Sequence, residues 1–252
     1  MTWILDLDGV VWLAEQPIPG AADAVARLRA AGERVVFVTN NSSVRLADQE
    51  TKLADHGIPA VGDVITSALV VAELVEPGER VLVAGGPGLV EALRLRGAEV
   101  VHNDGTDRGT FDAVVVGFHR DFDYERLRVA AVAVRAGARL IASNDDSTYP
   151  TPDGPIPGGG SILAAVERGS GALAVVAGKP YAPMAESLVH RFGTAGTVVG
   201  DRGDTDGGLA RAMGWRFALV LSGVTTDAAS LDPPPDLVAP DLAALVAAHV
   251  EG

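Results

Sequence analysis

The chain has 252 residues, of which 48% are hydrophobic and 21% charged, and its formal net charge is −13. This composition is typical of a globular protein with one large domain or two smaller ones, and the negative charge argues against a nucleic-acid polymer or an anionic membrane as partner. The lack of cysteine excludes disulfides, thiolate nucleophiles and zinc–thiolate sites, and it fits a cytoplasmic location. No apolar stretch is long enough for a membrane span, and Asp6 and Asp8 interrupt the early apolar run, so we expect no signal peptide.

Apolar runs rich in β-branched residues alternate with stretches of helical period along the whole chain. Two helical stretches, 21–32 and 124–137, both end at glycine, which is a common helix stop. Such alternation predicts βαβ units and a mainly parallel sheet, hence an α/β fold. The predicted strands are 3–5, 34–39, 63–66, 80–84, 113–117, 139–143, 174–177, 197–200 and 216–221.

The candidate catalytic and ligand-binding residues divide the chain into two parts. Polar residues follow predicted strands near 6–8, 39–43, 179 and 201–206. The intervening span has strands and helices of its own but few candidate catalytic groups, and a segment within it, 143–161, is rich in turn-forming residues. We therefore expect a core domain made of 1–77 and 179–252, with a second α/β domain, 78–178, inserted into it.

The first polar motif is "DLDG", residues 6–9. A strand that ends in two aspartates indicates either a reactive or metal-binding Asp6 with Asp8 as a nearby acid or base, or simply a turn and a helix cap. The second motif, "TNNSS", offers the Thr39 hydroxyl and the Asn40 and Asn41 amides where a helix is about to begin. This suits an anion, although plain helix capping explains it as well.

Two further motifs follow later strands. In "AGKP", Lys179 comes directly after an apolar run, where it either holds a phosphate or is a solvated loop lysine. In "VVGDRGDTDGG", Asp201, Asp204 and Asp206 follow a strand. Carboxylates are ligands that Mg²⁺ prefers, and Asp201 is closest to the strand end, but a capping cluster at a helix start is the alternative. The "GGPG" sequence at 85–88 lacks the third glycine of a dinucleotide fingerprint and predicts a turn.

Together, "LDLDGVVW", "TNNSS", "GKP" and "GDRGDTD" resemble, in order, the four motifs of the haloacid dehalogenase-like phosphohydrolases. The segments "VVVGFHRDFDYERL", "SNDDSTYPTPDGPIPGGGS" and "LVLSGVT" resemble subfamily IIA, the NagD-like or 4-nitrophenylphosphatase-like enzymes. The resemblance covers the whole chain. It implies a Rossmann-like parallel-sheet core with a large inserted α/β cap, and a Mg²⁺-dependent phosphatase that acts on small phosphomonoesters.

The resemblance also implies a role for each motif residue. Asp6 matches the nucleophile that forms an aspartyl-phosphate, and Asp8 matches the general acid and base. Mg²⁺ is then held by Asp6, by the backbone carbonyl of Asp8 and by Asp201. Asp206 matches a supporting carboxylate, while Asp204 occupies a variable position and receives no role.

The remaining implied residues contact the substrate. Thr39, Asn40, Asn41 and Lys179 match the phosphate-binding positions, and Tyr149 falls in the specificity loop of the cap, where it contacts the leaving group or packs within the cap. The physiological phosphomonoester is left open: a nucleotide, glycerol phosphate, a sugar phosphate or an aryl phosphate all fit. A homodimer through the cap is also left open.

Two other functions compete with the phosphatase. A haloacid dehalogenase needs neither Asp8 nor the Asp201 cluster, so the presence of both argues against it. A non-enzymatic phosphate-sensing module that is phosphorylated on Asp6 needs no acid and base and no full cap, both of which the sequence predicts.

Overall fold

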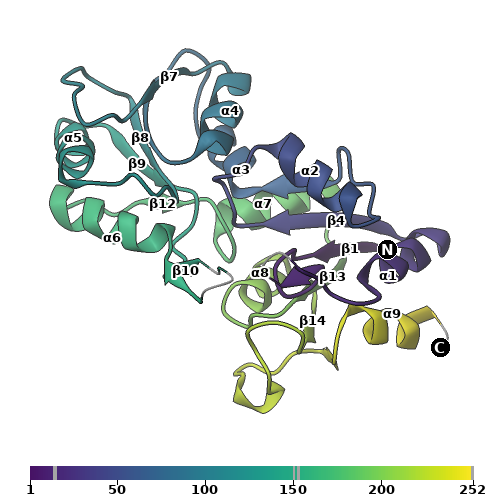
Figure 1. Cartoon of the computed structure of the whole chain (residues 1–252). Helices are drawn as coiled ribbons and strands as arrows, with labels where there is room; N and C mark the ends of the chain where they lie inside the picture. Colours follow the sequence, from purple (N-terminus) through teal and green to yellow (C-terminus); the bar gives the residue numbers. More distant parts are fainter. Residues whose placement is uncertain (14–15, 150, 152–153, 251–252) are drawn as a thin grey trace. The chain divides into compact units, whose positions relative to one another are not determined.

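The computed structural model describes residues 1–13, 16–149, 151 and 154–250, and its chain divides into two units. The first unit contains 1–39, 47–65 and 179–252, and the second contains 40–46 and 66–178. Figure 1 shows the course of the chain through both. Within the described residues, no helix is both long and apolar enough to cross a membrane.

The first unit is built around a six-stranded sheet of order β15-β14-β13-β1-β4-β5. The pairs of β1 with β4 and β13, of β13 with β14, and of β14 with β15 are parallel. The strands are β1 (Thr2–Leu5), β4 (Arg34–Thr39), β5 (Val64–Thr66), β13 (Gly196–Gly200), β14 (Arg216–Val220) and β15 (Leu237–Ala239). β1 lies at the centre and is buried from Trp3 to Leu5, as a strand covered by helices on both faces must be.

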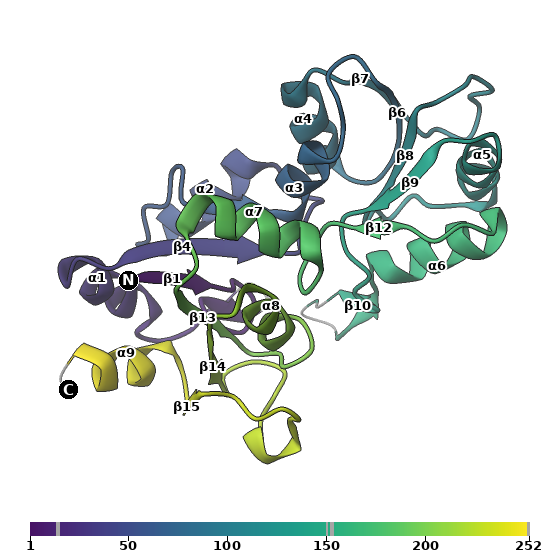
Figure 2. The ribbon, with the colours of Figure 1, turned by 180° about the vertical axis from the view of Figure 1, so that it is seen from behind.

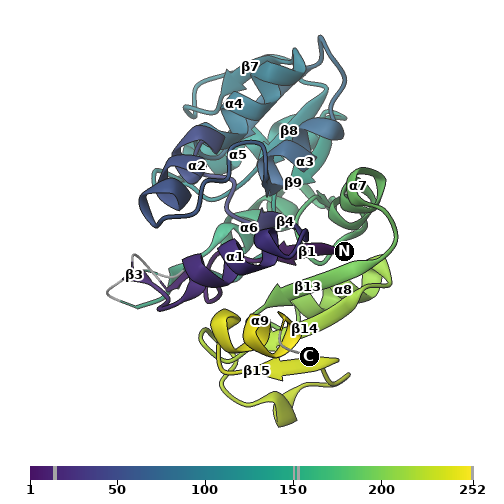
Figure 3. The same cartoon turned by 90° about the vertical axis from the view of Figure 1, so that its right-hand side faces the viewer.

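Helices cover this sheet in two pairs. α1 packs on α9, and α7 packs on α8, which also contacts β13 and β14. Figure 2 shows α7 and α8 in front of the strands, and Figure 3 shows the strands from the side. A small antiparallel hairpin, β2 (Trp12–Leu13) with β3 (Gln16–Pro17), follows β1. The helices are α1 (Ala21–Ala30), α2 (Leu46–Asp55), α7 (Ala182–Phe192), α8 (Asp206–Met213) and α9 (Leu242–Val250), with a 3₁₀ turn at Ala228–Ser230.

The second unit has its own five-stranded sheet, of order β12-β9-β8-β6-β7, with all neighbouring pairs parallel. The strands are β6 (Arg80–Ala84), β7 (Glu99–His102), β8 (Ala113–Val116), β9 (Arg139–Ala142) and β12 (Val175–Val176). The helices are α3 (Ser67–Glu73), α4 (Pro87–Arg96), α5 (Tyr124–Arg135) and α6 (Gly159–Ser170), and a hairpin joins β10 (Thr148–Tyr149) to β11 (Ile156–Pro157).

Residue alternation along these strands explains how the second unit packs. Leu82, Val114 and Val116 point to the same side of the sheet, where they form a core with α5 and α6. α3 and α4 pack together separately from this core.

The α/β class and the parallel sheets are thus confirmed. The strands predicted at 34–39 and 80–84 match β4 and β6 at both ends. Positions 150, 152 and 153 of the predicted turn-rich segment lie outside the described residues, and the hairpin of β10 and β11 occupies part of the remainder.

Candidate active site

The first aspartate of the "DLDG" motif lies at the carboxyl end of β1, beside β13. The Asp6 N–H donates to the carbonyl oxygen of Val199 at 2.9 Å, so the sheet fixes the backbone that carries this side chain. The chain then turns at Gly9, whose φ is +80°. A Cβ atom at Gly9 would lie 2.5 Å from the Asp201 carboxylate. Glycine is therefore required here both by the turn and by the approach of the Asp201 side chain.

Asp201 follows β13 directly, at the neighbouring strand end. Its side chain is buried, and its Oδ2 accepts a hydrogen bond of 2.6 Å from the Val224 N–H. A Cβ atom at Gly223 would lie 2.0 Å from the same oxygen. β1 and β13 are adjacent, yet the chain leaves them toward opposite sides of the sheet, to β4 and to β14. The two aspartates thus lie at the switch point of the sheet, where α/β proteins bind their ligands.

Lys179 joins two of the buried carboxylates. Its Nζ lies 2.8 Å from Asp6 Oδ1 and 2.7 Å from Asp206 Oδ1, and its side chain is only 3% exposed. Burial by itself lowers the pKa of this lysine, but the charges of Asp206 and Asp6 outweigh burial and raise the pKa above its usual range. The lysine is therefore a fixed positive charge at this site.

The carboxylates themselves are crowded. Burial raises the pKa of Asp6, Asp201 and Asp206 to about 6 each. Lys179 opposes the rise at all three, whereas the neighbouring carboxylates add to it. Three acidic groups face one lysine, so full ionisation leaves an excess of two negative charges. A divalent cation would balance this excess.

The donor set fits such a cation. Asp6, Asp201 and Asp206 each offer a carboxylate oxygen, and these oxygens lie within 4.8 Å of one another. Among the described residues of the first unit, no hydrogen-bond donor contacts Asp6 Oδ2 or Asp201 Oδ1. Both oxygens of Asp206 are engaged, by Lys179 and by the Arg202 N–H at 3.2 Å. Oxygen ligands of this kind suit Mg²⁺, and Asp6 and Asp201 have the oxygens to spare.

Thr39 ends β4 on the other side of β1. The register pairs Leu5 with Phe37, which places Thr39 at the same edge of the sheet as Asp6. Its side chain is buried. The structure therefore brings Asp6, Thr39, Lys179, Asp201 and Asp206 to one edge of the first unit.

Asp8 is held by a residue that sequence reasoning missed. The Trp12 indole Nε1–H donates to Asp8 Oδ1 at 3.0 Å, across the turn that connects β1 to the β2–β3 hairpin. Trp12 is buried, and the Lys52 Nζ lies 4.2 Å from its ring centroid. The available sequence signal was an aromatic residue with an N–H donor, four positions after Asp8. The contact depends on the β2–β3 hairpin, whose two-residue strands are too short to show a periodic pattern.

Asn40, Asn41 and Tyr149 belong to the second unit and have partners there. Asn40 Nδ2 donates to Asp146 at 3.2 Å, and Asn41 Nδ2 donates to the Tyr149 hydroxyl at 3.3 Å. The Tyr149 ring stacks on Phe118 with centroids 4.5 Å apart. The two asparagines and the tyrosine expected to contact substrate thus form part of one hydrogen-bonded region of this unit.

Asp204 differs from its two neighbours in the same motif. Its carboxylate is exposed and pairs with Arg202 at 2.9 Å. The hydrogen bond from Arg202 holds the pKa of Asp204 below its usual value. An exposed and neutralised carboxylate of this kind contributes little to a buried site.

Comparison with known proteins places these features in a family. The haloacid dehalogenase-like hydrolase model matches residues 3–99, and a second HAD-hydrolase-like model matches 176–245. The D-glycerol 3-phosphate phosphatase of Mycobacterium tuberculosis is 39% identical over 91% of this chain, which spans 66% of that protein.

Two solved structures are similar along nearly the whole chain. A glycerol phosphate phosphatase from Mycobacterium tuberculosis in complex with magnesium has a TM-score of 0.87 and 37% identity, over 97% of this chain and 75% of that one. The 4-nitrophenylphosphatase of Thermotoga maritima has a TM-score of 0.87 and 33% identity, over 98% of this chain and 96% of that one.

Proposed function

Because the chain belongs to the haloacid dehalogenase-like hydrolases, in their NagD-like and 4-nitrophenylphosphatase-like subgroup, we propose that it is a Mg²⁺-dependent phosphatase of small phosphomonoesters. The observation that carries this proposal is the buried arrangement in which Lys179 bridges Asp6 and Asp206 beside Asp201. A phosphate dianion can approach these carboxylates only where positive charge offsets them, and the lysine and a divalent cation supply it.

In the proposed reaction, Asp6 is the nucleophile. Its free carboxylate oxygen attacks phosphorus, and the bond from phosphorus to the leaving oxygen breaks as the aspartyl-phosphate forms. Asp8 donates the proton that the leaving oxygen takes up. Asp8 then removes a proton from water, which attacks the same phosphorus and releases inorganic phosphate, so Asp6 is restored.

As the family motifs imply, Asp6, the backbone carbonyl of Asp8 and Asp201 would hold the cation. When bound, Mg²⁺ neutralises charge on the phosphoryl oxygens. We assign Asp206 a supporting role, because its two oxygens already hold Lys179 and the backbone at Arg202. Asp206 thereby keeps the lysine charged and directed toward Asp6.

Phosphate and leaving group require further contacts. We propose that Thr39, Asn40, Asn41 and Lys179 bind the phosphate, as the family motifs imply. We also propose that residues 78–178 form a cap domain and that Tyr149 in it contacts the leaving group. The hydrogen bond between Asn41 and Tyr149 supports a link between these two functions.

Phosphate release from p-nitrophenyl phosphate tests the proposal. We expect turnover with Mg²⁺, none after chelation, and none in Asp6→Asn. Asp204→Asn is the matched control, because it makes the same chemical change at an exposed, paired carboxylate and should leave turnover intact. Activity in Asp6→Asn would overturn the assignment of the nucleophile, and halide release from a haloacid without Mg²⁺ would favour a dehalogenase.

Assays with a panel of phosphomonoesters identify the substrate. D-glycerol 3-phosphate comes first, because the 39% identical relative is named for it, and sugar phosphates and nucleoside monophosphates follow. The substrate is the compound with the highest kcat/KM. A cytoplasmic location and a homodimer are further proposals, which cell fractionation and light scattering test.

A further inference from the structure

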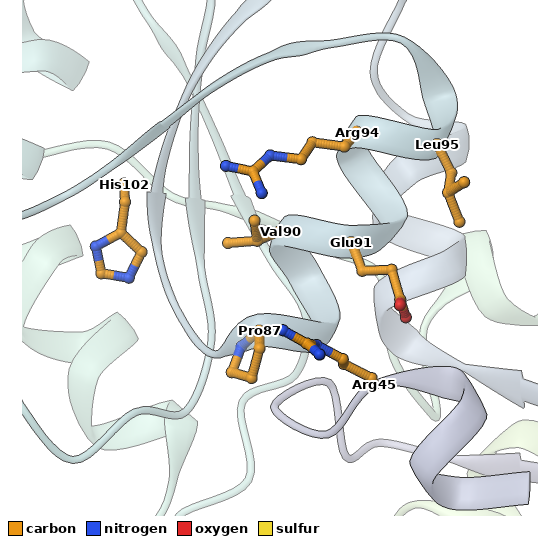
Figure 4. Close-up of a pocket in the computed structure, with 7 residues that line it drawn as sticks. All are labelled: Arg45, Pro87, Val90, Glu91, Arg94, Leu95 and His102. Carbon is orange, nitrogen blue, oxygen red and sulfur yellow. The ribbon is translucent and has the colours of Figure 1, made fainter.

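A hollow lies at the carboxyl edge of the sheet in the second unit, apart from every residue assigned above. It encloses about 450 Å³ between α4 and the end of β7. Figure 4 shows the guanidinium groups of Arg45 and Arg94 and the His102 ring around Val90 and Pro87, while Leu95 lies farther along α4. The volume is in the range of small-molecule sites.

A second hollow of about 370 Å³ shares Pro87 and His102 with the first. It is lined by Gly85 and Gly86, which follow β6, and by Phe118 to Asp121, which follow β8. β6 and β8 are adjacent, and the chain leaves β6 for β7 on the opposite side. The combined groove therefore lies at the switch point of this sheet, the position at which parallel sheets bind ligands.

The positive side chains of the groove lack partners. Most other arginines of the described residues are paired, as Arg80 is with Glu99 and Arg34 with Asp63. In the described part of the chain, the arginines whose guanidinium group has no hydrogen bond or ion pair are Arg45, Arg94, Arg120 and Arg168. All but Arg168 line the groove. Carboxylates are plentiful in a chain of net charge −13. Three guanidinium groups without a carboxylate partner along one groove are therefore unexpected.

The acidic side chains in the groove are already occupied. Glu91 accepts a hydrogen bond of 3.1 Å from the Leu46 N–H at the start of α2, and Asp121 pairs with Arg126 at 3.1 Å. His119 also lines the groove, but burial lowers its pKa, so it is not a source of positive charge. Three arginines, Arg45, Arg94 and Arg120, thus face two carboxylates, Glu91 and Asp121, and the groove keeps an excess of positive charge.

We propose that this groove binds a small polyanion, a molecule with two or more carboxylate or phosphate groups. Guanidinium groups form paired, charge-assisted hydrogen bonds to both kinds of group. The apolar side chains of Pro87, Val90 and Phe118 favour a ligand with a short carbon skeleton over a bare ion. Because every residue that lines the groove belongs to the second unit, the ligand is an effector separate from the substrate.

Titration of the full chain with tricarballylate tests binding, because this tricarboxylate has no phosphoryl group for Asp6 to attack. In Mg²⁺-free buffer we expect saturable shifts of the Arg94 Nε–H signal and of the amide signals of residues 88–90. Arg45→Gln with Arg94→Gln should weaken binding about a hundredfold, at about tenfold for each charge-assisted contact. Arg168→Gln removes an unpaired arginine outside the groove and should change nothing.

Kinetics then check that the ligand is an effector and not a part of the substrate. If the groove holds part of the substrate, the double variant raises KM for phosphoglycolate, whose leaving group carries a carboxylate, and leaves KM for p-nitrophenyl phosphate unchanged. If the ligand is a separate effector, both KM values stay the same while tricarballylate binding is lost. Equal tricarballylate affinity in the wild type, the double variant and Arg168→Gln overturns the proposal. Absence of all phosphatase activity would count against the proposed function only, since the titration does not depend on turnover.

Discussion

Mg²⁺ should stabilise the chain far more at neutral pH than in mild acid. Burial raises the pKa of Asp6 and Asp201 to about 6, above the usual 3.8. A raised carboxyl pKa means that the ionised form is disfavoured in the fold, so without metal these groups make the fold less stable as pH rises through this range. The cation reverses that effect, because it binds the ionised form.

The size of the effect follows from the two ligands. At about pH 5, each of the two carboxyl groups must lose a proton before it binds the cation, which lowers the Mg²⁺ affinity about tenfold per group. The affinity should therefore be about a hundredfold lower than at pH 7.5. A Mg²⁺ concentration of about 100 times the neutral Kd contributes about 2.7 kcal/mol of stability at pH 7.5 and about 0.4 kcal/mol at pH 5. For a chain of this size, these values correspond to Tm gains of roughly 5–10 °C and about 1 °C.

Calorimetric melting at the two pH values, with and without Mg²⁺, measures both gains. Asp201→Asn should abolish the gain at neutral pH, whereas Asp204→Asn, the exposed control, should retain it. Equal gains at both pH values would show that the metal does not bind the carboxylates with raised pKa. A full gain in Asp201→Asn would show that this residue is not a ligand.

Three other substitutions test the surroundings of the site. Trp12→Phe keeps an aromatic ring but removes the N–H that holds Asp8, so kcat should fall about tenfold, in line with a lost hydrogen bond to a charged group, with KM nearly constant and an altered pH–rate profile. Gly223→Val places a side chain against Asp201 and should remove the Mg²⁺ effect on Tm while far-UV circular dichroism stays the same. Lys179→Met leaves two buried carboxylates without their cation and should cost about 3–5 kcal/mol in denaturant unfolding at neutral pH, with a smaller loss in acid, where the carboxylates are protonated.

Much of the fold was predictable because its signals are local. The alternation of apolar runs with helical stretches predicted parallel sheets, and parallel strands place their polar ends on one edge. This is why Asp6, Thr39 and Lys179 could be grouped before any geometry was known. The strand β7 was not predicted, since Glu99–His102 is a half-exposed edge strand with little hydrophobic contrast. β15, Leu237–Ala239, is an edge strand of the same kind.

Contacts across turns were harder to foresee. The hydrogen bond from Trp12 to Asp8 depends on a turn and a hairpin of two-residue strands, which have no periodic pattern. The hydrogen bond that Asn41 Nδ2 donates, by contrast, goes to the Tyr149 hydroxyl, in a hairpin more than a hundred residues later. A contact of that sequence separation is fixed by tertiary packing, about which single-residue patterns carry no information.

Among the three aspartates of "GDRGDTDGG", Asp201 was predicted to be the metal ligand because it is nearest the strand end, and the geometry supports this choice on independent grounds. All three follow the same strand, and residue type alone makes each an equal candidate for the metal. Their surroundings separate them: Asp204 is exposed and paired with an arginine, and Asp206 is buried with both oxygens bonded. Asp201 is buried with one oxygen bonded to a backbone N–H. A buried carboxylate with a spare oxygen and a raised pKa is the one that gains most from a cation, which supports Asp201 rather than its neighbours as the ligand.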